Sequence, residues 1–405
     1  MPKKGVYQQL VESQAVTDVK GLRDQRVVLI KRIQELRQRP LVSYVTSLTP
    51  MPKATAYISH EDKIPFGEIL DSVDGDKVDV LVESPGGLSE VAVELATLLR
   101  NRYKDVAFIV PHAAMSAATM LVMSGDDILM DYRSALGSID PQFVGPDGRP
   151  QPAQAILTGL DTIKKQVDEN KGVLHPAYIP ILRAIDPGKL QSALDATELS
   201  IQIVTEYLVK YKFRTWTKHS KTGEPVTPEE RQARARFVAE KLCDHQKWLS
   251  HSHPIKIEDL EELKVKISDY GKTPELQSAI WALWVHYYHF LSSTNTYKIY
   301  ESEFTDFYKA ALPIGAQQGA PFPAMPGMPQ GAVPMAGHVD AMVGCIRCGK
   351  QHKVQANFGA VQKLEAGAVA FPQSCTMICD GCGNSLDLTG LKMAIEARVK
   401  RNLVF

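Results

Sequence analysis

The segment from His112 to Asp131, HAAMSAATMLVMSGDDILMD, constrains the fold more than any other part of the chain. It places Ser116 at the start of a short apolar helix, directly after the strand-like run Ala107 to Val110. Unpaired N–H groups at a helix start stabilise developing negative charge, so this position suits a nucleophile. The sequence SPGG at 84–87 follows another strand-like run, 78–82, and would bring backbone N–H donors to the same point. Together these features predict acyl-transfer chemistry.

Composition indicates a globular protein of two or three domains. The chain has 405 residues and is 44% hydrophobic, which is enough for a sizeable core. Basic and acidic residues number 46 each, so no global field directs the protein to nucleic acid or to anionic membranes. No run approaches the roughly 18 apolar residues that span a bilayer, and the first residues lack the apolar core of a signal peptide. We therefore expect a cytoplasmic protein.

The order of apolar segments predicts an α/β fold. Strand, helix and strand alternate from 107 to 131, and right-handed crossovers would place the strands in a largely parallel sheet covered by helices. Site residues are then expected where strands end and helices begin. The other predicted elements are an amphipathic helix within 6–38, strands at 41–48, 54–59 and 78–82, a helix at 88–102 capped by Ser89, helices through 152–213 and 228–248, and an aromatic-rich helix over 275–311, assigned to core or subunit packing.

Two Cys-x-x-Cys-Gly sequences lie near the end of the chain, at 345–349 and 379–383. Glycine after each pair lets the backbone turn, so that four thiolates converge on one tetrahedral Zn²⁺. The predicted ligands of this structural zinc ribbon are Cys345, Cys348, Cys379 and Cys382. Cys375 or His352 could replace one of them, and a redox-active dithiol is the competing use of such pairs. A domain this small needs its metal to fold.

Four sequence blocks in the first half of the chain resemble the serine dehydrogenase proteinase family. That family is a Clp-fold branch related to signal peptide peptidases and to the proteolytic subunit of the Clp protease. The blocks are ESPGG at 83–87, VPHAAMSAATM at 110–120, DDILMD at 126–131 and ALGSIDPQ at 135–142. The resemblance covers about residues 26 to 143 and implies a Clp/crotonase-like ββα superhelix, here with a helical extension and an added zinc ribbon.

The resemblance also implies roles around Ser116, which would be the nucleophile. The N–H groups of Gly87 and Ala117 would form an oxyanion hole, and Gly86 would allow the close approach of the chain. An extended substrate could add as a strand beside 86–89. No cofactor is implied for catalysis.

The general base is where this sequence departs from its relatives. Clp subunits carry a histidine after the strand that follows the nucleophile helix, where this chain has GSIDPQ. Signal peptide peptidases use a lysine farther on, and Lys164 and Lys165 lie in a comparable helical region, so we predict a Ser–Lys dyad. A lysine buried beside a serine can act as a base, whereas a solvated lysine cannot. His112 is another candidate, four residues before the serine.

The remaining titratable residues are weaker candidates. His175, His251 and His253 are expected to be surface or core residues. Asp127 and Asp140 could orient a base, although an acidic residue before proline is also a common turn former.

Three functions fit these observations. The first is a serine endopeptidase that hydrolyses peptide bonds through an acyl-enzyme on Ser116. The second is a catalytically inactive Clp-fold scaffold whose zinc ribbon recruits a protein or, less favoured, a nucleic-acid partner; the missing Clp-type histidine motivates it. An acyl-CoA enzyme ranks third, because such enzymes rarely need a serine at this turn and no nucleotide-binding basic pocket is evident. A Rossmann cofactor site is unsupported, since no G-x-G-x-x-G follows a strand.

We predict four parts along the chain: an N-terminal helix at 1–40, the peptidase domain with its helical extension at 41–311, a Pro/Gly/Met-rich linker at 312–342 and the zinc ribbon at 343–405. The linker has almost no charge and includes Met325, Met328 and Met335. Because crotonase-like proteases usually assemble as rings, the resemblance also implies a homo-oligomer that acts on polypeptide substrates.

Overall fold

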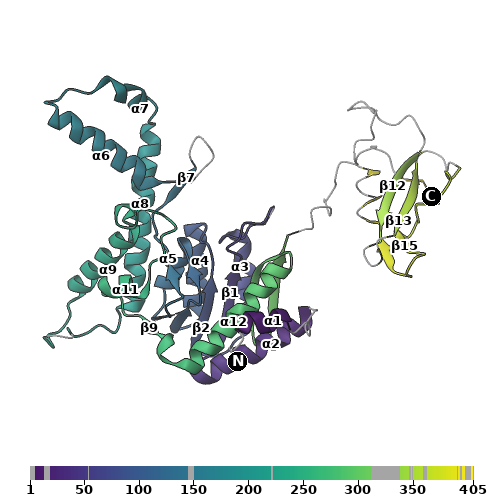
Figure 1. The fold of residues 1–405 in the computed structure, drawn as a ribbon, viewed down its shortest axis with the longest axis horizontal. Coiled ribbons are helices and arrows are strands. Elements are labelled where there is room, and N and C mark those ends of the chain that lie inside the picture. The colour runs from purple at the N-terminus through teal and green to yellow at the C-terminus, as the bar shows by residue number, and fades with distance from the viewer. Residues whose placement is uncertain are drawn as a thin grey trace. The chain divides into compact units, whose positions relative to one another are not determined.

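The computed structural model forms two compact units, Met1–Leu312 and Pro313–Phe405 (Figure 1). The structure describes residues 5–12, 19–52, 54–144, 150–219, 222–311, 338–345, 348, 350–358, 363–389, 391–392, 395–396 and 403–404. Met325, Met328 and Met335 of the predicted linker therefore lie outside the described residues.

A seven-stranded sheet forms the centre of the first unit, in the order β11-β10-β1-β2-β3-β5-β9. Its strands are β1 (Leu41–Thr46), β2 (Lys77–Glu83), β3 (Asp105–Ile109), β5 (Asp127–Met130), β9 (Ser268–Asp269), β10 (Thr296–Ser302) and β11 (Asp306–Ala310). The five from β1 to β9 run parallel, while β10 and β11 are antiparallel additions at one edge. The register places Val42 beside Val80, Val80 beside Phe108 and Phe108 beside Ile128, and all four are buried.

Helices cover both faces of this sheet, because successive strand residues point to opposite sides. Val80 and Val82 pack into one core and Leu81 into the other. The first core includes residues of α3 (Lys63–Asp71), α4 (Ser89–Arg102) and α5 (Ala117–Met123). The second includes residues of α2 (Val19–Arg37) and α12 (Pro274–Ser293), and α1 (Val6–Glu12) packs on α12. The predicted layered α/β arrangement is thus confirmed.

A helical extension lies between β5 and β9 in the sequence. It comprises β7 (Gln142–Val144), β8 (Pro150–Pro152), α6 (Ala153–Glu169), η2 (Pro176–Tyr178), α7 (Ile179–Arg183), α8 (Pro187–Tyr207), the π-helical η3 (Leu208–Lys212), α9 (Pro228–Cys243), α10 (His245–Trp248) and α11 (Ile257–Glu262). The helices α8 and α9 pack together and α5 contacts α8, whereas α6 and α7 project away from the sheet (Figure 1).

A second, shorter ladder crosses the ends of the main strands. β4 (Ala113–Ala114) pairs in parallel with β6 (Ala135–Leu136), and single bridges join Ser84 to Ala114, Leu136 to Ile255, and Ile58 to Gly87. The chain therefore turns at the carboxyl end of β2 and again after β3, which gives the ββα repeat of the predicted superhelix. This ladder gathers the sequence blocks around Ser84, Ala114 and Leu136 in one place.

Three predicted elements need correction. Residues 54–59 do not form a strand; Ile58 makes one bridge, and η1 (His60–Asp62) follows. The aromatic helix ends at Ser293 and not at 311, because the alternating β-branched and aromatic residues of β10 and β11 extend the sheet from β1. Ser89 does not cap α4, since it is the first helical residue and Leu88 occupies the N-cap.

The second unit contains two small sheets around its own core. Strands β12 (His338–Gly344), β13 (Gln351–Asn357) and β14 (Ala368–Ala370) form one sheet, and β15 (Thr376–Ile378) pairs with β16 (Ser385–Asp387). β12 begins inside the segment predicted to be linker. In the part of the chain that the structure describes, no helix has the length and apolar character needed to cross a membrane.

Candidate active site

Ser116 lies on a sharp turn between β4 and α5. Its backbone angles are φ 52° and ψ −119°, a conformation that costs a non-glycine residue about 1–3 kcal/mol. Neighbouring hydrogen bonds hold this turn: Met115 N–H donates to Ser84 O at 2.9 Å and Ala118 N–H donates to Met115 O at 2.9 Å. A strained serine on a strand-to-helix turn presents its hydroxyl at the tip of the turn, as a nucleophile requires. Ser116 is half-buried, whereas Ala117 behind it is buried.

Two glycines let other backbone segments approach Ser116 closely. A Cβ atom on Gly86, which has φ 98°, would lie 2.6 Å from Met115 O and 2.7 Å from Ser116 Cβ. A Cβ atom on Gly137 would lie 2.9 Å from Ser116 N. Any larger residue at these positions would displace the turn. The backbones of the SPGG and ALGS blocks therefore pack directly against the Ser116 turn.

The N–H groups of Gly87 and Ala117 are both available beside Ser116. Ile58 N–H donates to Gly86 O at 2.7 Å and Leu88 N–H donates to Ile58 O at 2.9 Å, so the intervening N–H of Gly87 points away from Ile58. Among the described residues, neither Gly87 N–H nor Ala117 N–H has a hydrogen-bond acceptor. The Cβ position of Gly86 is 3.2 Å from Ala117 N, which places both donors near one point.

The same contacts restrict where a substrate strand could add. Ile58 already occupies the side of 86–89 that Gly86 O and Leu88 N face. Any further strand must therefore pair through Gly87, on the side of Ser116. Because Ile58 occupies one side of 86–89, the predicted addition of a substrate strand is possible only on the other side.

Lys164 and Lys165 are exposed on α6, whose main contacts are with α8 and β8. α6 packs against α8 and projects from the unit together with α7, whereas α5 lies between α4 and α8 (Figure 1). The single chain therefore does not bring either lysine to the serine.

His112 lies closer to the serine. Its Nδ1 is 3.6 Å from Glu83 Oε2, its ring packs against Trp284 with 5.0 Å between centroids, and its side chain is 43% exposed. Glu83 at the carboxyl end of β2 and Trp284 of α12 therefore both lie against this imidazole, which follows β3.

The pairing of buried Asp140 with half-buried His251 is the feature that sequence reasoning missed. His251 Nδ1 is 2.7 Å from Asp140 Oδ1, and Ser138 Oγ donates to the same oxygen. Burial alone would raise the pKa of Asp140, but the hydrogen bonds from His251 and Ser138 outweigh it and hold this pKa below its usual value. His245 Nδ1 is also 3.3 Å from the carboxylate. Because 111 residues separate Asp140 from His251, no local sequence pattern could have paired them.

A cavity of about 410 Å³ is bordered by His112, His251 and the segments that surround Ser116. Its wall includes Pro85 and Met115 from the two segments at the serine, and the side chains of His112, Arg133, His251 and Lys256. His251 therefore faces the same space as the residue before Ser116, whereas His245 does not line it. A carboxylate that holds Nδ1 of an imidazole leaves Nε2 free to accept a proton.

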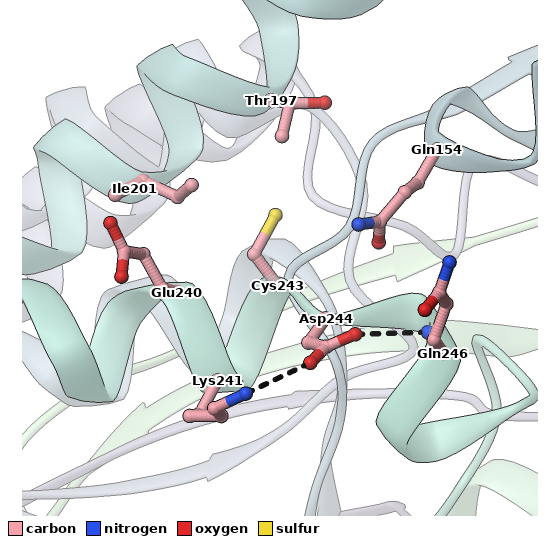
Figure 2. Close-up of a pocket in the computed structure, with 8 residues that line it drawn as sticks. All are labelled: Gln154, Thr197, Ile201, Glu240, Lys241, Cys243, Asp244 and Gln246. Atoms are coloured by element: carbon pink, nitrogen blue, oxygen red, sulfur yellow. Dashed lines mark hydrogen bonds and ion pairs between the residues drawn. The ribbon is translucent and has the colours of Figure 1, made fainter. Parts of the chain in front are cut away.

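A second cavity, of about 360 Å³, lies among α6, α8, α9 and α10 (Figure 2). The Cys243 thiol points into it between Ile201, Thr197 and Gln154 (Figure 2). Burial raises the pKa of Cys243 to about 12, so this thiol is not a nucleophile near neutral pH.

The predicted zinc ligands come together in the second unit. The four sulfurs of Cys345, Cys348, Cys379 and Cys382 all lie within 4.8 Å of one another, and the 345–382 and 348–379 pairs are 3.6 Å apart. Four sulfurs at about 2.3 Å from a tetrahedral Zn²⁺ are about 3.8 Å apart, so the cluster fits one metal ion.

The two reserve ligands differ in position. His352 Nε2 is 3.3 Å from Cys379 Sγ, where it can hydrogen-bond to the thiolate. The thiol of Cys375 faces Gln373 O at 4.0 Å and is not part of the four-sulfur group.

Together, the crossed ladder and the glycine-lined serine turn place the first unit in the Clp/crotonase-like class. Within it, residues 56–176 match the family described as ClpP-like SDH-type serine proteinase. The family resemblance and the fold class predicted from the sequence are thus confirmed.

Two curated relatives and two solved structures show partial similarity. Two uncharacterized proteins of Methanocaldococcus jannaschii are 34% identical over 88 residues, 22% of this chain, and 22% identical over 191 residues, 47% of this chain. The matches span only 31% and 52% of those relatives. A mutant of a membrane-bound stomatin-specific protease matches 28% of this chain and 59% of its own at 16% identity and a TM-score of 0.22. An enoyl CoA isomerase from M. smegmatis matches 51% of this chain and 92% of its own at 13% identity and a TM-score of 0.20.

Proposed function

We propose that the first unit is a serine peptidase that cleaves polypeptide through an acyl-enzyme on Ser116. The observation that carries this proposal is the turn itself, where Gly86 and Gly137 leave room for the serine and two unused N–H groups converge beside it. Backbone strain at a half-buried hydroxyl on a strand-to-helix turn is the arrangement that acyl transfer requires.

We propose His251 as the base, oriented by Asp140. In this mechanism His251 Nε2 takes the proton of Ser116 Oγ as the oxygen attacks the substrate carbonyl carbon. The N–H groups of Gly87 and Ala117 hold the oxyanion, and the imidazolium then gives its proton to the leaving amine. The 2.7 Å bond to Asp140 supports this role because it fixes the ring and stabilises the charged imidazolium. The Ser–Lys dyad with Lys164 or Lys165 is the competing assignment, and it would need α6 of another copy of the chain.

Labelling with a peptidyl phosphonate tests the nucleophile. We expect one phosphonate adduct per active chain, located by peptide mapping at Ser116, and hydrolysis of an unfolded protein substrate that Ser116→Ala abolishes. The Ser124→Ala variant is the matched control, since that hydroxyl is buried at the other end of α5 and binds Leu121 O. A chain that is neither labelled nor active would contradict the proposal and favour the inactive scaffold.

For the second unit we propose a structural zinc ribbon. Cys345, Cys348, Cys379 and Cys382 would hold the ion, which would cross-link the two Cys-x-x-Cys turns and take no part in peptide hydrolysis. We propose that the ribbon binds a protein or presents substrate, because Lys350, His352, Lys353 and Lys363 give it only a modest basic character. A homo-oligomeric assembly is proposed from the family resemblance.

A further inference from the structure

The cavity beside the serine turn has an unbalanced set of charges. Two permanently cationic side chains, Arg133 and Lys256, lie in its wall together with His112 and His251. No aspartate or glutamate lines the cavity. The remaining lining residues are small, apolar or neutral, so any fixed charge that a ligand meets there is positive.

Lys256 is the less compensated of the two cations. Its Nζ donates to the backbone carbonyl oxygens of Ser134 at 2.8 Å, Arg133 at 3.3 Å and Tyr132 at 3.4 Å. Among the residues that the structure describes, no carboxylate pairs with this ammonium group. Carbonyl dipoles fix its position without neutralising its charge, so it retains attraction for an anion.

Arg133 is held rigidly at the same wall. Its guanidinium is 2.8 Å from Asp131 Oδ2 and lies over the Trp281 ring at 4.2 Å and the Tyr132 ring at 4.7 Å. Asp131 offsets its charge, but the fixed planar group keeps further N–H donors in a defined orientation. Two positioned cations lose little conformational entropy when a ligand binds, which favours affinity.

We propose that this cavity binds a carboxylate of the polypeptide substrate, with Lys256 as the main specificity-determining residue and Arg133 as its neighbour. The inference rests on the proposed peptidase function, because it makes the cavity a subsite next to the scissile bond. An acidic side chain and a free C-terminus carry the same carboxylate, and either would be attracted by the uncompensated charge of Lys256 and could accept hydrogen bonds from the remaining N–H donors of Arg133. A neutral amide in its place would leave the ammonium group without an anionic partner.

Binding to the full-length Ser116→Ala chain tests this subsite without cleavage. Four fluorescent decapeptides of one sequence are compared by anisotropy: internal Glu against internal Gln, and a free C-terminus against a C-terminal amide. We expect at least one acid to bind about tenfold more tightly than its amide, with the ratio falling as NaCl rises from about 50 to 500 mM. The pair that shows the ratio identifies the source of the carboxylate. Equal binding within both pairs, or no binding of any peptide, would overturn the proposal.

Lysine variants in the same background assign the effect. Lys256→Met should remove the preference for the acid, and Lys256→Arg should keep it because the charge remains. Lys77→Met is the control, since this exposed lysine is at the opposite end of β2 from the serine turn. A preference that survives in a folded Lys256→Met chain would overturn the role of Lys256, and the peptide pairs decide the subsite even if that variant unfolds.

Hydrolysis by the chain with Ser116 intact separates the two proposals. If acids bind preferentially but no peptide is cleaved, the peptidase function fails and the carboxylate site stands. If all four peptides are cleaved with equal kcat/KM and bind equally, the carboxylate site fails and the peptidase function stands.

Discussion

At the scale of single residues, the candidate site depends on side chains whose roles are set by their neighbours. Ser116 is distinguished from the other serines by its backbone angles and by the glycines that face it. His251 is distinguished from His175 and His253 only by its bond to a buried carboxylate and its place in the cavity wall. Neither this bond nor this place in the cavity wall can be inferred from the position of a histidine in the sequence.

The choice between His251 and a lysine base gives the first residue-scale prediction. His251→Ala should lower kcat/KM for peptide hydrolysis by about 10²- to 10⁴-fold, since it removes the group that takes the serine proton. Lys164→Ala and Lys165→Ala should change kcat/KM less than about twofold, because both side chains are exposed on α6. If the His251→Ala chain is active and a lysine variant is inactive, the Ser–Lys dyad becomes the favoured assignment.

A matched pair of glycine variants tests the close packing of the serine turn. Gly86→Ala should destabilise the chain by about 1–3 kcal/mol and abolish hydrolysis, because its Cβ would be 2.6 Å from Met115 O at φ 98°. Gly67→Ala, in α3 where nothing lies within 4 Å of the new Cβ, should be neutral or stabilise by up to about 1 kcal/mol. Urea unfolding monitored by circular dichroism measures both. Similar losses in the two variants would refute the steric explanation.

At the scale of elements, a buried ion pair fastens α2 to the antiparallel edge of the sheet. Arg26 is fully buried; its Nε donates to Glu301 Oε2 at 2.7 Å and its Nη2 donates to Tyr308 Oη at 2.8 Å. The guanidinium also lies over the Phe290 ring at 5.0 Å. One side chain therefore joins α2, α12, β10 and β11.

Removing one member of this pair should destabilise the first unit strongly. Arg26→Met should lower the free energy of unfolding by about 3–5 kcal/mol, because Glu301 would remain buried without its partner. Adding Glu301→Gln should recover part of the loss. The surface pair of Lys63 and Glu94, 42% and 44% exposed, provides the control, and Lys63→Met should cost at most about 1 kcal/mol. Denaturant unfolding of the three variants and the unchanged chain measures these differences, and equal costs for Arg26→Met and Lys63→Met would contradict this explanation.

At the scale of the whole molecule, the two compact units should respond independently to metal removal. Cys379→Ser should eliminate the bound zinc, expected at one ion per chain by mass spectrometry of the metal, and unfold the second unit. Peptide hydrolysis by the first unit should persist, since Ser116 and the zinc cysteines belong to different units. Cys375→Ser, whose sulfur is outside the cluster, should keep its zinc. Loss of zinc from both variants would call for a different ligand set.

Much of this organisation was already readable in the chain. The strand and helix around Ser116, the four sequence blocks and the two cysteine pairs are local patterns, because helix starts, glycine turns and metal knuckles depend on residues close in sequence. The family resemblance carried by these blocks implied the close approach of Gly86, and in the structure the backbone of Gly86 lies against the Ser116 turn. The prediction from the sequence failed where the hydrophobic pattern changes its period. Residues after Ser293 were predicted to continue the helix, yet pairing with β1 makes them strands.

The residues that we propose as partners of Ser116 were brought together by the tertiary structure alone. Asp140 is buried with His251 because Ile139 N–H donates to Leu242 O and Leu136 pairs with Ile255, which brings the segment after α10 against the serine's ladder. The same pairing carries Lys256 to the cavity wall. Contacts across more than a hundred residues depend on the packing of the whole fold, and no periodicity or motif encodes them. The sequence by itself determined the candidate nucleophile and the four clustered cysteines, and folding determined which imidazole and which cations line the cavity beside Ser116.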